Sequence, residues 1–239
     1  MSRTIAILTF IAAVAFAVSP FLSSGFNGFA ANQFPVPQID APIQPAGYAF
    51  SIWGVIYLWL ILGTAFGLFA RAEAPDWHAG RLPLILSLAV GSTWIAVAQV
   101  SVIWATLLIW VMLGAAAAAL LRAGTDDRWL QGEPVGVYAG WLTAASCVSL
   151  GLMLAGYGLT SQTVAATIGL VLALAIATAV QRARPDSVAY PAAVIWALIG
   201  VIVGNLEPVN IGVICLAGVG IVWLGLSLVR NAQGRAIIG

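Results

Sequence analysis

An uninterrupted apolar stretch from Gly47 to Ala70 limits most strongly what this chain can fold into. It carries no charged residue, follows Pro42 and Pro45, and ends at Arg71. As a helix with a rise of about 1.5 Å per residue, it matches the hydrocarbon layer of a bilayer, which is about 30 Å thick. Proline suits the first turn of such a helix, where its missing N–H has no intrahelical partner. The stretch therefore predicts a membrane-spanning helix.

The composition extends this prediction to the whole chain. Of its 239 residues, 62% are hydrophobic and 7% are charged, and the mean hydropathy is +1.04. A soluble domain has about 25% charged residues, so these side chains are too few to cover a water-exposed surface. The net charge of +1 also provides no basic patch for a nucleic-acid partner. We therefore predict an all-α integral membrane protein whose main surroundings are the lipid bilayer.

Hydropathy along the chain predicts about eight transmembrane helices. A tight turn near Val102–Ala105 must separate the third helix from the fourth, because the two together are too long for one crossing. The first apolar run follows Arg3 and also fits a signal peptide. Because it approaches spanning length, we expect a retained helix. The predicted helices are 5–22, 47–70, 82–103, 104–121, 135–157, 163–181, 188–204 and 211–229.

The positions of the arginines predict the orientation. With eight crossings, all nine arginines fall on one side, at the two termini and in the loops 71–81, 122–134 and 182–187. The loops on the other side carry Asp40 and Glu207 and no arginine. Because Lys and Arg collect in cytoplasmic loops, both termini are predicted to be cytoplasmic. We expect the protein in the inner membrane of a bacterium.

Residue patterns typical of catalysis or metal binding are missing from the sequence. It has no carboxylate pair within the predicted helices, no glycine-rich phosphate loop and no metal-ligand spacing. The single histidine, His78, lies in a charged loop, and Cys147 and Cys215 lie in apolar runs, where thiols behave as small hydrophobic groups. We therefore predict no catalytic residue, no metal site and no enzymatic activity. Gln99 needs a polar partner in hydrocarbon, either a neighbouring helix or a ligand, and the sequence leaves both open.

Aromatic residues recur at helical spacing on three predicted helices. Trp53 and Tyr57 are four residues apart and share one face of the second helix. Trp94 lies on the third helix, and Tyr138, Trp141 and Ala145 follow one face of the fifth at i, i+3 and i+7. Aromatic side chains at such spacing generally serve packing, so the spacing by itself does not specify a pocket.

The order of these residues resembles that of the TspO/MBR (tryptophan-rich sensory protein, translocator protein) family. The segment Pro45–Phe50, followed by Trp53 and Tyr57, is similar to the family's signature at the entrance to its second helix. Trp94 is similar to the tryptophan of the family's Asn-x-x-Trp segment, and Tyr138 begins the Tyr-x-x-Trp-x-x-x-Ala pattern of its fifth helix.

The resemblance divides the chain into two parts. Residues 1–158 are similar to the family's five-helix bundle with its long first loop, 23–46, which we expect to fold back over the membrane face as a lid. Residues 159–239 would add three transmembrane helices that have no counterpart in that five-helix fold. Ala46 and Tyr48 depart from the family signature, which has a second proline and a tryptophan there.

The resemblance implies a membrane receptor or sensor for a flat hydrophobic small molecule, tetrapyrrole- or sterol-like, bound in a pocket between helices. Such a protein would contribute to transport or regulation of that molecule. No cofactor follows from the residues, while the resemblance implies a porphyrin or haem as ligand. The implied ligand-binding residues are Tyr48, Phe50, Trp53, Tyr57, Trp94, Gln99, Tyr138, Trp141 and Ala145.

Two other functions remain open at this point. A secondary transporter of a small solute would use the last three helices as a second bundle, although no carboxylate at mid-membrane is available for ion coupling. An accessory subunit of a larger membrane complex, or a homodimer, would use small residues such as Gly151 and Ala155 for close helix contacts.

Overall fold

The computed structural model describes residues 2–23 and 25–238 as a bundle of long helices, with no strand among these residues. Seven helices are long and apolar enough to cross a membrane, and the remaining one, α7, is apolar but shorter. The predicted all-α membrane fold is thereby confirmed. The helices are α1 (Ser2–Val18), α2 (Ile52–Phe69), α3 (Pro75–Val100), α4 (Val102–Arg122), α5 (Gly132–Gly156), α6 (Gln162–Ala183), α7 (Ala189–Gly204) and α8 (Ile211–Ile238).

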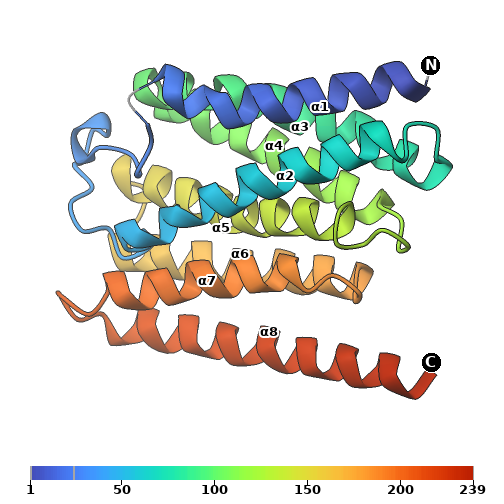
Figure 1. The fold of residues 1–239 in the computed structure, drawn as a ribbon. Coiled ribbons are helices and arrows are strands. Elements are labelled where there is room, and N and C mark those ends of the chain that lie inside the picture. Colours follow the sequence, from blue (N-terminus) through green and yellow to red (C-terminus); the bar gives the residue numbers. More distant parts are fainter. Residues whose placement is uncertain (1, 24, 239) are drawn as a thin grey trace.

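Figure 1 shows the helices running side by side, with the start of α1 and the end of α8 at the same end of the bundle. The loops after α2, α4 and α6 lie at that end too, and they carry Arg71, Arg128 and Arg184. We call this the arginine end. The first loop lies at the opposite end and contains three short 3₁₀ segments at its borders and centre, η1 (Ser19–Leu22), η2 (Ala31–Gln33) and η3 (Gly47–Ser51). Placement of the arginine end in the cytoplasm stays a prediction.

The start of α3 and the break between α3 and α4 differ from the sequence prediction. The segment 71–81 was predicted to be a loop, but α3 already begins at Pro75. Proline at the start and Asp76 in the first turn both favour a helix N-terminus. Because this first turn is polar, hydropathy does not identify it as part of the helix. The break between α3 and α4 falls at Ser101, whose hydroxyl accepts a hydrogen bond from the Trp104 amide and so caps α4.

Helix α5 is the central helix of the bundle. In its most apolar segment 67% of the residues are buried, against 22% in α8. It packs on α4, α6 and α7 and also touches α2. A Cβ added to Gly140 would lie 2.2 Å from the Tyr190 carbonyl oxygen, so only glycine permits the observed approach of α7. Close approach through small residues is how helices associate in lipid, where hydrophobic burial alone does not drive them together.

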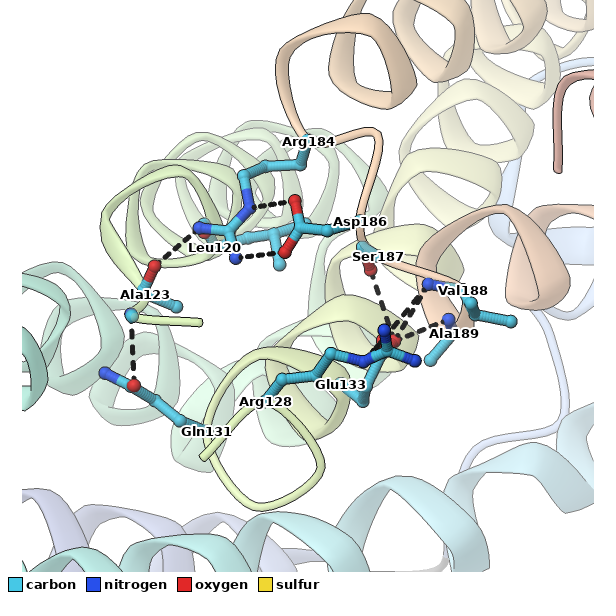
Figure 2. Close-up of polar contacts among 11 residues, drawn as sticks. Leu120, Ala123, Arg128, Gln131, Glu133, Arg184, Asp186, Ser187, Val188 and Ala189 are labelled. Atoms are coloured by element: carbon cyan, nitrogen blue, oxygen red, sulfur yellow. Dashed lines mark hydrogen bonds and ion pairs between the residues drawn. The ribbon is translucent and has the colours of Figure 1, made fainter. Parts of the chain in front are cut away.

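Three buried charged side chains cap helix ends at the arginine end. Arg81, which is 3% exposed, donates hydrogen bonds to the carbonyls of Gly67, Arg71 and Ala72 at the end of α2. Arg184 donates to the carbonyls of Leu120 (2.8 Å) and Ala123 (2.6 Å) at the end of α4, as Figure 2 shows. Both cations thus lie at the negative end of a helix dipole.

The third buried charge, Glu133, caps the start of α7. Its carboxylate accepts hydrogen bonds from the amides of Val188 (3.0 Å) and Ala189 (2.7 Å) and from the Ser187 hydroxyl (3.3 Å) (Figure 2). Arg128 forms an ion pair with it, with 3.3 Å between Nε and Oε1. An anion at the positive end of a helix dipole is stabilising, so Glu133 joins α5 to α7.

The cap predicts a stability effect for Glu133→Gln. The change removes the charge and turns one acceptor into a donor that faces other donors, so we expect a loss of about 1–3 kcal/mol in the free energy of unfolding. Thermal unfolding in detergent, followed by circular dichroism, measures it. Glu207→Gln, in the exposed turn after α7, is the control and should change stability by less than about 0.5 kcal/mol. Equal stability of the two variants would contradict the capping role.

Candidate ligand cavity beneath the first loop

A cavity of about 180 Å³ lies beneath the first loop, between α1 and the four helices that follow it. A smaller lobe of about 40 Å³ lies beside it toward α5 and α7. Phe26, Phe50, Trp94 and Ile109 line both spaces and separate them. The main cavity is lined by Phe16, Pro20, Phe26, Asn27, Phe50, Trp53, Tyr57, Gly91, Trp94, Ile95, Ile109, Met112 and Leu142.

Trp94 forms the wall on the side of α3. Its indole N–H donates a 2.8 Å hydrogen bond to the Ala105 carbonyl of α4, and its side chain is buried. Two rings of the first loop pack edge-on against it, Phe26 at 4.8 Å and Phe29 at 6.3 Å between ring centroids. The indole is therefore fixed in place, with the loop rings resting on it.

Phe16 of α1 lies at the centre of the aromatic walls. Its ring is 5.1 Å from Tyr57 and 5.9 Å from Trp53, both in edge-to-face geometry. A Cβ on Gly91 would lie 2.6 Å from this ring, so the glycine in α3 makes room for it. Sequence analysis missed Phe16, because nothing in the spacing of the first apolar run distinguishes it from a lipid-facing side chain.

Six of the nine predicted ligand-binding residues line one of the two spaces. Trp53 and Tyr57 are stacked, with 5.4 Å between their ring centroids. Trp141 meets Trp53 at 6.1 Å and Phe50 at 5.7 Å, in both cases edge-to-face. Most of the residues chosen from the sequence pattern therefore lie close together in the structure. The six are Phe50, Trp53, Tyr57, Trp94, Trp141 and Ala145.

The other three predicted residues have different surroundings. Tyr48 lines neither space, is 44% exposed and packs edge-on against Trp196 of α7. Tyr138 is fully buried behind Phe16, and its hydroxyl lies 2.9 Å from that of Ser87. The Gln99 amide donates a hydrogen bond to the Gly25 carbonyl, so its polar partner is the first loop.

The part of the first loop above the cavity, residues 25–33, is held by two glutamines. The Gln33 side chain donates a 2.9 Å hydrogen bond to the Ala98 carbonyl at the end of α3 and accepts one from the Ala30 amide. The Gln99 side chain, at the same end of α3, donates a hydrogen bond to the Gly25 carbonyl. These residues form the roof, in which Phe26 lines both spaces and Phe29 lines the smaller lobe.

The second part of the loop, residues 34–46, is anchored on α5, α6 and α7. Phe34 fills the space left by Gly156, where an added Cβ would lie 2.3 Å from its ring. Ile43 packs in the same manner against Gly151 of α5 and Gly169 of α6. Backbone hydrogen bonds from Val36 to Gly156 (2.8 Å) and from Ala46 to Gly200 (2.9 Å) complete the attachment.

Fold and cavity together define a multi-pass helical membrane protein with a cavity lined mainly by aromatic side chains. Among residues 2–23 and 25–238, no three His, Cys, Asp or Glu side chains gather as a metal site would require.

The model of the TSPO-like protein family matches residues 3–229, and the chain belongs to this family. The match includes α6, α7 and most of α8. Neither the curated proteins nor the solved structures gave a match. The predicted family is therefore confirmed, while the predicted division of the chain at residue 158 stays a prediction.

The anchoring of the loop predicts the effect of Phe34→Ala. Removing a buried ring lowers stability by about 3–5 kcal/mol. Here we expect the anchored part of the loop to be the region that is destabilised. We expect faster hydrogen exchange at the Val36 amide, measured by mass spectrometry in detergent. Phe21→Ala, a change at an 85% exposed ring, is the control and should leave exchange unchanged. Unaltered exchange at Val36 in the Phe34 variant would refute the anchor.

Proposed function

We propose that the protein is a membrane receptor for a flat hydrophobic small molecule, tetrapyrrole- or sterol-like, that binds in the cavity beneath the first loop without being chemically converted. Membership of the TSPO-like family suggests a membrane sensor or receptor for hydrophobic ligands. The observation that carries the proposal is the set of fixed aromatic walls around this cavity.

The chemistry of the walls supports a flat apolar ligand. The polar side chains that line the two spaces, Asn27, Gln44, Tyr57 and Ser149, are uncharged at neutral pH. Ring faces and edges bind planar hydrocarbon without the cost of burying a charge. A few uncharged polar groups then suffice to orient the ligand. The walls offer no acid–base pair, which supports a binding role over catalysis.

The cavity is too small for a tetrapyrrole unless the roof moves. Pockets for drug-sized ligands have about 300–1,000 Å³, and a cavity of about 150 Å³ holds a single benzene ring. The 180 Å³ observed here therefore fits a molecule of one or two rings. A tetrapyrrole requires Phe26 to move out, and because this ring separates the two spaces, its movement joins them.

Fluorescence quenching tests the site. We expect saturable quenching of tryptophan emission when protoporphyrin is added to the detergent-purified protein. The affinity should fall about tenfold or more in the double variant Trp53→Phe, Trp141→Phe. Each substitution removes stacking area, which weakens binding by about 1 kcal/mol. Trp223→Phe, on the exposed face of α8, is the matched control. Quenching that does not saturate, or an equal loss in the control, would refute the proposal.

The roof predicts a kinetic effect of Gln33→Ala. This variant removes the hydrogen bonds of Gln33 to Ala98 and Ala30, each worth about 1 kcal/mol. Opening of the roof becomes easier, so protoporphyrin should associate several-fold faster in stopped-flow fluorescence. Gln162→Ala is the control, because it removes a 3.4 Å hydrogen bond to Gln38 in the anchored part of the loop and leaves the roof contacts unchanged. Identical association rates for wild type and the Gln33 variant would show that the ligand does not enter through the roof.

A further inference from the structure

A second apolar space, separate from the cavity, lies between α2 and α7. It is a groove of about 460 Å³, and its open side faces outward between α2, which is long enough to cross a membrane, and the shorter apolar helix α7. Val137 of α5 forms part of its floor, and the exposed side chains of Val55 and Ala192 lie on its two sides. Because lipid surrounds these helices, whatever occupies the groove comes from the bilayer.

Fixed indole rings lie at the two ends of the groove. Toward the arginine end, Trp59 stacks on Trp129 and donates a 2.8 Å hydrogen bond to its carbonyl. Toward the other end, Trp196 donates a 2.9 Å hydrogen bond to the Ala49 carbonyl. Since their N–H groups are already bonded to the protein, these indoles offer only apolar surface to the groove. Such a lining suits a hydrocarbon chain.

Arg128 lies at the arginine end of this groove. Its guanidinium carbon is 4.8 Å from the centroid of the Trp129 ring, and its side chain is 28% exposed. Its counterion Glu133 caps Val188 and Ala189, which also line the groove (Figure 2). Among the described residues, neither Nη group of Arg128 has a hydrogen-bond acceptor, so both remain available as donors.

The charge of Arg128 is not fully cancelled by Glu133. The Glu133 carboxylate also balances the start of α7, where the helix dipole amounts to about half a positive charge. A net positive potential therefore remains beside the end of an apolar groove, at the level where lipid headgroups lie. A guanidinium binds a phosphate through two parallel hydrogen bonds, and basic pockets between transmembrane helices bind anionic lipid headgroups.

We propose that the groove between α2 and α7 binds one anionic phospholipid, with an acyl chain between Trp59 and Trp196 and the phosphate at Arg128. This site is distinct from the cavity beneath the first loop and is built in part from α7. It would be occupied by a lipid from the leaflet at the arginine end. Binding there would hold α2 against α7, which are otherwise joined mainly through α5 and η3.

Native mass spectrometry tests the lipid site. The detergent-purified protein is mixed with equal amounts of phosphatidylglycerol and phosphatidylcholine that have the same acyl chains, and retained lipids are counted. We expect about fivefold more phosphatidylglycerol, since one arginine near a membrane surface contributes about that factor. The preference should vanish in Arg128→Gln and persist in Arg128→Lys. Ala192→Phe, which fills the groove, should lower retention of both lipids.

Two matched variants separate this site from general lipid contact. Arg122→Gln removes an exposed arginine at the same end, and Ala179→Phe enlarges an exposed alanine of α6 about one turn from that end. Both should keep wild-type lipid retention. Equal losses in these controls, or no phosphatidylglycerol preference in the wild type, would overturn the proposal. If Arg128→Gln does not fold, the comparison of Ala192→Phe with Ala179→Phe decides, because neither alanine side chain makes a polar contact.

Discussion

The close approach of other segments to α5 is the interaction on which the structure depends. Hydrocarbon surrounds the bundle, so burial of apolar surface does not by itself bring helices together, and association relies on van der Waals contact and hydrogen bonds. Gly140 lets the α7 backbone approach, and Gly156 receives Phe34. The same helix therefore positions α7 and the first loop. The cavity beneath that loop owes its roof in part to helices outside the first five.

The buried charged side chains lie at one end of the molecule and cap the helix termini there. An isolated ion in hydrocarbon is strongly unfavourable, yet Arg81, Glu133 and Arg184 are buried. Each meets unpaired backbone groups at a helix end and has the sign that the helix dipole favours. At the surface of the same end, the Arg71 guanidinium hydrogen-bonds to Asp127 and holds the pKa of that carboxyl below its usual value. The buried charges therefore all lie at the arginine end, and the aromatic cavity lies toward the opposite end, beneath the first loop.

The two apolar spaces differ in what they can select. The cavity is covered by the first loop and has uncharged walls, so shape and ring stacking would decide what the proposed receptor binds there. The groove between α2 and α7 is open to the bilayer and ends near Arg128, so charge decides which lipid is retained. Helix α2 contributes to both, through Trp53 on one face and Trp59 on another. A lipid in the groove would therefore contact α2, the same helix that forms part of the cavity wall.

The sequence alone determined the membrane fold, the approximate helices, the single arginine-bearing end and the family. These properties depend on length, hydropathy and the order of residues along the chain, which act locally. Only the tertiary structure decided which rings face the cavity. Tyr48 and Phe50 are two residues apart, yet one packs on α7 and the other lines the cavity.

Phe16 and Glu133 show the physical reason for this limit. The first contributes to the cavity because Gly91, far along the chain, leaves space for its ring. The second is buried because the start of α7, more than fifty residues away, supplies its hydrogen-bond donors. Such complementarity between distant segments leaves no periodic signal in the sequence, so side-chain surroundings were decided by packing.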